Sequence, residues 1–367
     1  MTISRRAALG LGALGASAAL TAGAVLFRGN PAVRGLLGDV TTLRGYAGGE
    51  KIAFIENPKT ISALKHFGLA LVADRAGSVD QVRDPQLLGT KPQFLWPSSS
   101  SLVELARRNV KVLRDQVIFN SPIVIYSWTP FAEGLVRAGM AVKEHEHYYI
   151  DAKQLIDAVL ARRPWKELGQ PDLYGTVRLI ATDPNKSNSG FMFAGLAGNL
   201  LAGEVVTMEN LPAILPPLTE LFRGMGYKPD SSGKVFDDYV AGGPGADPLV
   251  VGYENQLVEW IIQDPDRWAR VEAAGGPAKP VALYPRPTVY SAHPLLALTP
   301  ESLRLSDALM SLELQTIGWR DHGFRGPLGS IGADTNDLIK GRMPAQIASV
   351  APMPDIEVML KILAALA

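Results

Sequence analysis

Short runs of β-branched and aromatic residues alternate with segments of helical period along most of this 367-residue chain. The first unit is an apolar run at 51–58 (KIAFIENP), a helical pattern through Ser62 and Leu64, and a second apolar run at 68–78 (GLALVADRAGS). A long β-branched run follows at 116–128 (QVIFNSPIVIYSW). This alternation predicts an α/β fold in which helices bury the faces of a sheet. It continues through 151–165, 177–184, 191–203, 248–262 and 281–298, and the last helical segment is 303–326.

Several of the apolar runs end in a polar loop that opens a helix. These loops are 73–78 (ADRAGS), 97–101 (PSSSS), 182–190 (TDPNKSNSG) and 252–256 (GYENQ). In open α/β sheets the ligand crevice lies outside the carboxyl ends of the strands, so loops that are distant in the sequence converge there. The pattern therefore predicts a binding site built from many segments.

Length and composition indicate an ordinary globular protein of two domains. The chain is 47% hydrophobic and 20% charged, which is enough apolar material for a large core. The 36 Lys and Arg residues balance the 36 Asp and Glu residues, so no basic field exists to attract nucleic acid. Cysteine is absent, which excludes disulfides and thiolate metal sites. We expect a monomer without a cofactor.

The N-terminus has the pattern of an export signal. Arg5 and Arg6 precede an apolar stretch of small residues at 7–27, as in twin-arginine signals. About 20 apolar residues also suffice to cross a bilayer, so residues 1–27 are either an export signal or an uncleaved anchor. A G-x-G-x-x-G run at 10–15 lies inside this stretch without a preceding strand, which excludes a dinucleotide site. We expect an exported protein, periplasmic or extracellular, that touches the membrane only through this segment.

Catalytic motifs are absent from the sequence. It contains no G-x-S-x-G and no H-E-x-x-H pattern, and its five histidines leave little choice for a general base. The sequence therefore favours a protein that is not an enzyme.

The order of the polar loops and strands resembles a known family. The segments are 50–58 (EKIAFIENP), 73–78, 95–101 (LWPSSSS), 117–128, 180–190 (IATDPNKSNSG), 250–256 (VVGYENQ), 284–298 (YPRPTVYSAHPLLAL) and 314–325 (LQTIGWRDHGFR). Together they resemble the type 2 extracellular solute-binding proteins of bacterial ABC uptake systems, in the group that includes the molybdate and other oxyanion binders. The S-N-S-G loop at 187–190 and the ending His322-Gly-Phe-Arg325 carry the resemblance most specifically.

The resemblance implies a two-lobed α/β fold with a mixed sheet and flanking helices in each lobe. Lobe 1 would comprise residues 48–125 and 288–367, and lobe 2 residues 126–287. Two hinge crossings are expected near 123–126 and 283–290. Ligand would be trapped in the cleft between the lobes and delivered to the permease of a membrane transporter.

Donor groups in three of the loops are the first candidates for ligand contact. Hydroxyl, amide and backbone N–H donors at a helix start suit an anion without a buried cation. Serine and asparagine at these positions are also the usual N-cap residues, so capping alone is the alternative explanation. The candidates are Gly77, Ser78, Ser98, Ser99, Ser100, Ser187, Asn188, Ser189 and Gly190.

A second set of candidates lies at the proposed crossings and at the end of one strand: Tyr126, Tyr253, Glu254 and Tyr284. Aromatic groups there would close over the ligand, and hinge packing is the alternative, as it is for His293. Glu254 would repel an anion, so either it points away or the ligand carries a positive or hydroxyl group. A glutamate at a helix start also complements the helix dipole.

The expected function is capture of a small solute, an oxyanion or a carboxylated molecule. One alternative is a membrane-anchored sensor or scaffold with the same fold. A second alternative is a ferric ion binder using Tyr148 and Tyr149. The nearby run His145-Glu-His147 has no third metal ligand at a spacing typical of metal-binding motifs, so we expect no metal site there.

Overall fold

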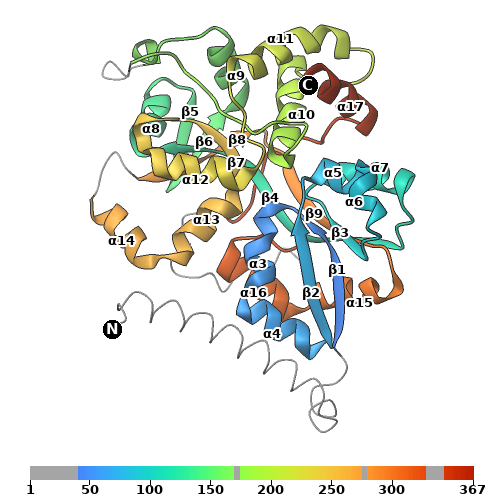
Figure 1. Cartoon of the computed structure of the whole chain (residues 1–367). Helices are drawn as coiled ribbons and strands as arrows, with labels where there is room; N and C mark the ends of the chain where they lie inside the picture. The colour runs from blue at the N-terminus through green and yellow to red at the C-terminus, as the bar shows by residue number, and fades with distance from the viewer. Residues whose placement is uncertain (1–39, 169–173, 275–278, 328–342) are drawn as a thin grey trace, which may run out of the picture.

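Two groups of helices and strands, one above the other in Figure 1, share one long strand. The computed structural model describes residues 40–168, 174–274, 279–327 and 343–367. The expected signal or anchor at 1–27 lies outside these residues. Within the described ranges, no helix has both the length and the apolar character that a bilayer crossing needs.

The lower group is built on one mixed sheet. Its strand order is β2-β1-β3-β9-β4, in which β1 pairs in parallel with β2 and β3, and β9 pairs antiparallel with β3 and β4. The strands are β1 (Thr41–Ala47), β2 (Leu69–Arg75), β3 (Phe94–Trp96), β9 (Tyr290–Ala297) and β4 (Arg114–Trp128).

The upper group contains the second sheet, which β4 also enters. β4 pairs with β9 as far as Pro122 and with β7 from Ile123 onward, so the strand passes from one sheet into the other. The change of partner occurs between Pro122 and Ile123, and the hinge positions and lobe boundaries stay predictions. The remaining strands of this sheet are β5 (Ala141–Glu144), β6 (His147–Asp151), β7 (Val250–Tyr253) and β8 (Pro280–Arg286).

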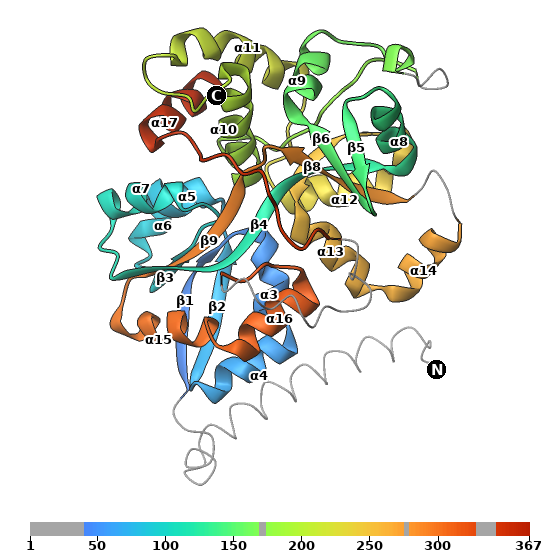
Figure 2. The same ribbon diagram turned by 180° about the vertical axis from the view of Figure 1, so that it is seen from behind.

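Helices cover both groups, as Figures 1 and 2 show from opposite sides. Those of the lower group are α3 (Ile52–Glu56), α4 (Pro58–His66), α5 (Ser78–Arg83), α6 (Pro85–Gly89), α7 (Ser101–Asn109), α15 (Pro300–Leu309) and α16 (Leu312–His322). Those of the upper group are α8 (Thr129–Arg137), α9 (Ala152–Leu160), α10 (Asn188–Ala202), α11 (Leu211–Gly224), α12 (Ser232–Gly242), α13 (Glu254–Gln263), α14 (Pro265–Ala273) and α17 (Ile356–Ala365). Short 3-10 turns occur at Gly49–Lys51, Trp165–Leu168 and Gly243–Gly245. The predicted α/β fold is confirmed.

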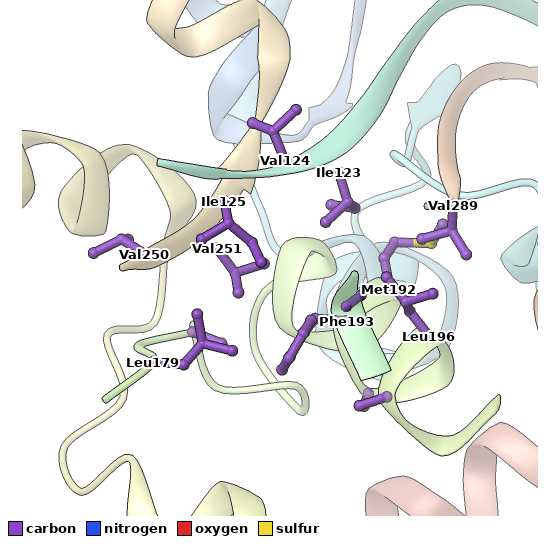
Figure 3. Close-up of a cluster of buried hydrophobic side chains, with 14 of the residues drawn as sticks. Ile123, Val124, Ile125, Leu179, Met192, Phe193, Leu196, Val250, Val251 and Val289 are labelled. Atoms are coloured by element: carbon purple, nitrogen blue, oxygen red, sulfur yellow. The ribbon is translucent and has the colours of Figure 1, made fainter. Parts of the chain in front are cut away.

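Each group has its own core. In the upper group β4 and β7 pack on α10, where Ile125, Val251 and Phe193 meet (Figure 3). In the lower group the core is aromatic, with the Phe119 ring 4.7 Å from that of Phe324 and 4.9 Å from that of Phe54. This burial of apolar surface is the main stabilising contribution of each group.

Several predicted elements are corrected by the structure. The run at 51–58 is not a strand: it forms the end of a 3-10 turn and helix α3, because buried Lys51, Phe54 and Ile55 follow helical spacing. The strand that precedes it, β1, was not predicted. Residues 177–184 form only an isolated bridge, between Ile180 and Val250, and no full strand.

The C-terminal region also differs from the prediction. The single helical segment expected at 303–326 is two helices, α15 and α16, separated at Met310–Ser311. Another helix, α17, follows them and packs against α10 and α11 above and α7 below. The last helix of the chain therefore contacts both groups of elements.

Candidate functional site

Five segments that open helices converge where the two groups meet. Three follow strands of the lower sheet: Gly48–Lys51 after β1, Ala76–Ser78 after β2 and Pro97–Ser101 after β3. Two belong to the upper group: the loop 182–190 before α10, and Tyr253 with Glu254 between β7 and α13. We call the polar residues at this junction the interlobe cluster: Glu50, Lys51, Ser78, Ser98, Ser187, Asn188, Ser189, Tyr253, Ser291 and His293.

A buried ammonium lies at the centre of the lower half of this cluster. Lys51 is fully buried, and its Nζ donates to Glu50 Oε1 at 2.5 Å, to Ser98 Oγ at 2.7 Å and to His293 Nδ1 at 3.2 Å. The Ser98 hydroxyl donates to the same Glu50 oxygen. All three ammonium protons therefore have acceptors, as a buried cation requires.

Burial and charge set the protonation of this group. Burial, followed by the Lys51 charge, lowers the pKa of His293 to about 4, so its ring is neutral at pH 7 and Nδ1 accepts from Lys51. Burial also lowers the pKa of Lys51, against the attraction of Glu50. For Glu50, burial opposes ionisation, but Lys51 and His293 outweigh it and hold the pKa well below its ordinary value. We therefore describe Glu50 and Lys51 as an ion pair with no net charge.

Asn188 joins the upper half of the cluster to the lower half. Its Nδ2 donates to the Ser98 carbonyl at 2.7 Å, to the Tyr253 hydroxyl at 3.0 Å and to Ser291 Oγ at 3.4 Å. The Ser291 hydroxyl donates to the same Ser98 carbonyl. The first residue of α10 is thus hydrogen-bonded directly to the loop after β3.

The helix starts at the junction lack side-chain caps. The N-cap residues Gly77, Ser100, Ser187 and Tyr253 make no side-chain hydrogen bond to their helices. The capping alternative therefore does not account for the Ser187 hydroxyl. Away from the junction, α8 and α11 also lack such caps, but seven other helices have them, from Asn57, Asp84, Asp151, Ser231, Asp264, Ser311 and Asp355.

Two buried amides beside these starts have atoms without hydrogen-bond partners among the described residues. They are Oδ1 of Asn188 and both polar side-chain atoms of Asn255. An unpartnered buried polar atom is costly, and native structures rarely keep one without a reason. These atoms mark the starts of α10 and α13 as places where a polar ligand group would be favourable.

The hydroxyls of the remaining predicted donors lie in or next to the cluster. Ser78 Oγ accepts from the backbone N–H of Ser98 at 2.9 Å. Ser189 Oγ lies 2.7 Å from Thr182 Oγ1 and 3.3 Å from Ser187 Oγ, in a buried chain of hydroxyls. Ser99 is buried, and its Oγ accepts from Ser101 N at 3.3 Å. Ser100 is exposed, which makes it the least suited of the serines to hold a buried ligand.

The two predicted glycines are places of close approach. A Cβ on Gly77 would lie 2.3 Å from the Lys186 carbonyl oxygen, on the opposite side of the junction. A Cβ on Gly190 would lie 2.3 Å from the Thr182 carbonyl oxygen of its own loop. Only glycine permits this approach of backbone to backbone.

Tyr126 is not brought to the cluster. Its ring packs 5.1 Å from that of Phe236 and 5.5 Å from that of Tyr239, and its hydroxyl donates to the Tyr253 carbonyl at 2.6 Å. Tyr126 therefore fits hinge packing, the alternative to ligand contact given in the sequence analysis. The reason is that strand β4 presents Tyr126 to α12 and not to the junction.

Glu254 and Tyr284 line a separate cavity of about 320 Å³ in the upper group. The Tyr284 hydroxyl donates to Glu254 Oε1 at 2.7 Å, and Arg325 binds both oxygens of Glu254. Burial and then the Glu254 charge raise the pKa of Tyr284 well above its ordinary value, so the phenol stays protonated. Glu254 thus points away from the interlobe cluster, which resolves the repulsion that its sequence position would cause.

The residues considered as metal ligands are not arranged around one point. Tyr148 and Tyr149 are neighbours on β6, so their side chains point to opposite faces of the sheet. The Tyr148 hydroxyl donates to Glu133, whereas the Tyr149 ring packs against the Arg286 guanidinium. His145 and Glu146 form the turn between β5 and β6. Among the described residues no three His, Asp or Glu side chains are grouped to hold a metal.

Sequence reasoning missed Glu50, Lys51 and Ser291. The signal for the first two was present: the pair Gly48-Gly49 followed by Glu-Lys repeats the pattern of a polar loop opening a helix. This signal was not recognised because 51–58 was interpreted as a strand. The loop that opens a helix was therefore expected after residue 58 and not before it. Ser291 alternates with His293 on β9, so both side chains point to the same face of the sheet.

Comparisons with known proteins give a fold and no closer relationship. No protein-family model and no curated protein sequence matches the chain. A periplasmic thiamin-binding protein has a similar structure, with a TM-score of 0.60 at 11% identity, over 89% of this chain and 96% of that one. The periplasmic binding protein AfuA from Actinobacillus pleuropneumoniae, with exogenous fructose-6-phosphate bound, gives 0.56 at 12% identity, over 88% and 96%.

A third similar structure is the substrate-binding protein of an ABC transporter from Agrobacterium tumefaciens. Its TM-score is 0.55 at 14% identity, over 90% of this chain and 95% of that one. The chain therefore has the two-lobed fold of periplasmic binding proteins. We refer to the two groups of elements described above as its lobes.

Proposed function

We propose that the protein is an exported solute-binding protein that captures a small solute between its lobes and delivers it to an ABC-type membrane transporter. The observation that carries the proposal is the convergence of five helix-opening segments, from both lobes, on one buried polar cluster. Binding proteins of this architecture trap a ligand by closing two domains around it.

The composition of the cluster supports a polar solute with an anionic group, either an oxyanion or a carboxylated molecule. Serine hydroxyls, the Asn188 amide, the Lys51 ammonium and uncapped helix starts are all donors to anions. Because the lobes contact each other directly at Asn188 and Ser98, binding requires the lobes to separate and close again on the ligand.

One observation favours the alternative of a sensor or scaffold. Direct hydrogen bonds between the lobes fill the junction, as in a cleft that has become a fixed interface. In that case the lobes would stay closed, and the protein would act through a partner and not through a transported solute. The ferric ion alternative lacks support of this kind, because Tyr148 and Tyr149 lie on opposite faces of β6.

A thermal-shift screen followed by native mass spectrometry tests the proposal. The mature protein is screened with oxyanions, mono- and dicarboxylates, amino acids, sugar phosphates and ferric ion. A true ligand at a hundred times its Kd adds about 2.7 kcal/mol to the free energy of unfolding. If no class of compound changes the Tm, and no small molecule co-purifies with the protein, solute binding is contradicted and the scaffold alternative is favoured.

A further inference from the structure

We infer that Glu50 is a built-in carboxylate that occupies the anion position of the interlobe cluster, so the natural solute carries a carboxylate that replaces it. This inference rests on the proposed function and names the class of its ligand. The observation that supports it is the set of hydrogen-bond donors around Glu50 Oε1.

The donors around Glu50 Oε1 come from different parts of the fold. Lys51 Nζ, at the start of α3, and the Ser98 hydroxyl, in the loop after β3, both donate to this oxygen. His293 Nδ1, on β9, lies 3.4 Å from it but is not a donor to it, because this nitrogen accepts from Lys51. A carboxylate oxygen that meets an ammonium and a hydroxyl in a buried site has the coordination of a bound anionic ligand.

These donors are held in place by contacts that do not involve Glu50. Lys51 also donates to Ser98 Oγ and His293 Nδ1, and Ser98 N donates to Ser78 Oγ. His293 is further fixed by its carbonyl, which accepts from Trp96 Nε1 at 3.2 Å. The donor set therefore stays assembled when the Glu50 side chain is removed.

Glu50 itself follows two glycines, whose backbone freedom would allow its side chain to turn outward. It follows Gly48 and Gly49, and a Cβ on Gly48 would lie 2.6 Å from Glu50 Oε1. The absence of side chains at 48 and 49 leaves room for the carboxylate on this side of the loop. Turning the Glu50 side chain outward would free the position without moving Lys51 or Ser98.

The requirement for an anion at this position follows from the burial of Lys51. An ammonium with no exposed surface is costly unless an opposite charge pairs with it. When Glu50 leaves, a ligand carboxylate would restore the pairing, whereas a neutral solute would not. On the other side of the position, Asn188 and Tyr253 belong to the opposite lobe and would contact the rest of the solute on closure.

Chemical rescue of Glu50→Ala by acetate tests this inference without knowledge of the natural solute. The variant leaves Lys51 without its partner, and we expect a lower Tm than that of the wild type. Acetate should raise this Tm saturably, by about 2 °C or more once its concentration is several times its Kd. Sodium chloride and sodium sulfate at equal ionic strength serve as salt controls.

Matched variants identify the position of the acetate. Glu50→Gln fills the same space without charge, and it should not respond to acetate beyond the salt control, nor should the wild type. The double variant Glu50→Ala/Lys51→Met removes the cation that needs an anion, and its acetate response should disappear. An equal response in all four proteins, or none in Glu50→Ala, overturns the inference.

If Glu50→Ala does not fold on expression, refolding gives the same answer. Dilution from denaturant into sodium acetate should restore the native circular dichroism spectrum, whereas dilution into sodium chloride should not; failure in both solutions counts against the inference. A neutral solute found in the wild-type screen, without acetate rescue, would leave the transport function standing and overturn only the carboxylate class.

Discussion

Arg325 forms a bidentate ion pair with Glu254, in which Nε donates to Oε2 at 2.6 Å and Nη2 donates to Oε1 at 2.8 Å. Arg325 follows α16 and pairs with Asn120 in the lower group, whereas Glu254 opens α13 in the upper group. The two side chains are 13% and 1% exposed. This ion pair links the two lobes beside the strand that crosses between them.

The first prediction concerns this pair. Arg325→Leu leaves the Glu254 carboxylate buried without its cation and should lower the free energy of unfolding by about 3 to 5 kcal/mol. Chemical denaturation measures the change. The control is Glu144→Gln, which breaks another bidentate pair, with Arg286 at 2.7 and 2.8 Å, on the exposed surface. That variant should lose much less stability than Arg325→Leu, because solvent screens the exposed pair. Equal losses would mean that Glu254 is hydrated in solution.

The second prediction concerns pH. The folded pKa of His293, about 4, lies below its ordinary value of 6.5. As the pH falls below 6.5 the unfolded chain therefore binds a proton that the folded protein excludes, and stability is lost down to about pH 4. The loss amounts to about 3 kcal/mol at most. Glu50, whose pKa is also lowered, adds its own loss only below its ordinary value of 4.5.

The window between pH 6.5 and 4.5 therefore separates the effect of His293 from that of Glu50. The charged and titratable groups that face its ring are Lys51 and Glu50 from the start of α3 and Tyr253 from β7. Urea denaturation of the wild type and of His293→Gln should show a smaller pH dependence in the variant over this window. Parallel curves would show that the imidazole is accessible to protons in the folded state.

The third prediction concerns the uncapped start of α10. Ser187→Ala should lower the free energy of unfolding by about 0.5 kcal/mol or less, because its hydroxyl makes no cap hydrogen bond. Ser231→Ala is the matched comparison: Ser231 Oγ accepts from Lys234 N at 3.2 Å and caps α12, so its loss should cost about 1 kcal/mol. If Ser187→Ala costs as much as Ser231→Ala, the serine is a cap in solution and its role in the site is in doubt.

The fourth prediction concerns lobe closure. Gly77→Ala places a Cβ 2.3 Å from the Lys186 carbonyl oxygen, and because this contact is with backbone the lobes must move apart. Small-angle X-ray scattering should show a larger radius of gyration than for the wild type. Gly89→Ala is the control, since nothing lies within 4 Å of its added Cβ. An unchanged radius in both variants would show that the lobes are already separated in solution.

The candidate site could be predicted in part. The loops at Ser78, Ser98 and 187–190 were found because a polar segment between an apolar run and a helical pattern is a local signal. Lys51 was not found, since its role depends on partners 47 and 242 positions away in the chain, Ser98 and His293. Tyr126 was misplaced among the site candidates because the strand pattern does not say which face of β4 meets the junction.

The sequence by itself determined the class of fold and the places where helices open. Alternating periods of two and 3.6 residues are set by local geometry, and they were sufficient for β4, α10 and α13. Only the tertiary structure decided which loops meet, that Glu254 turns to Arg325, and that Glu50 and Lys51 form the centre of the cluster. The physical reason is that burial and pairing of charges depend on neighbours brought together by strand order, and strand order is not a local property of the chain.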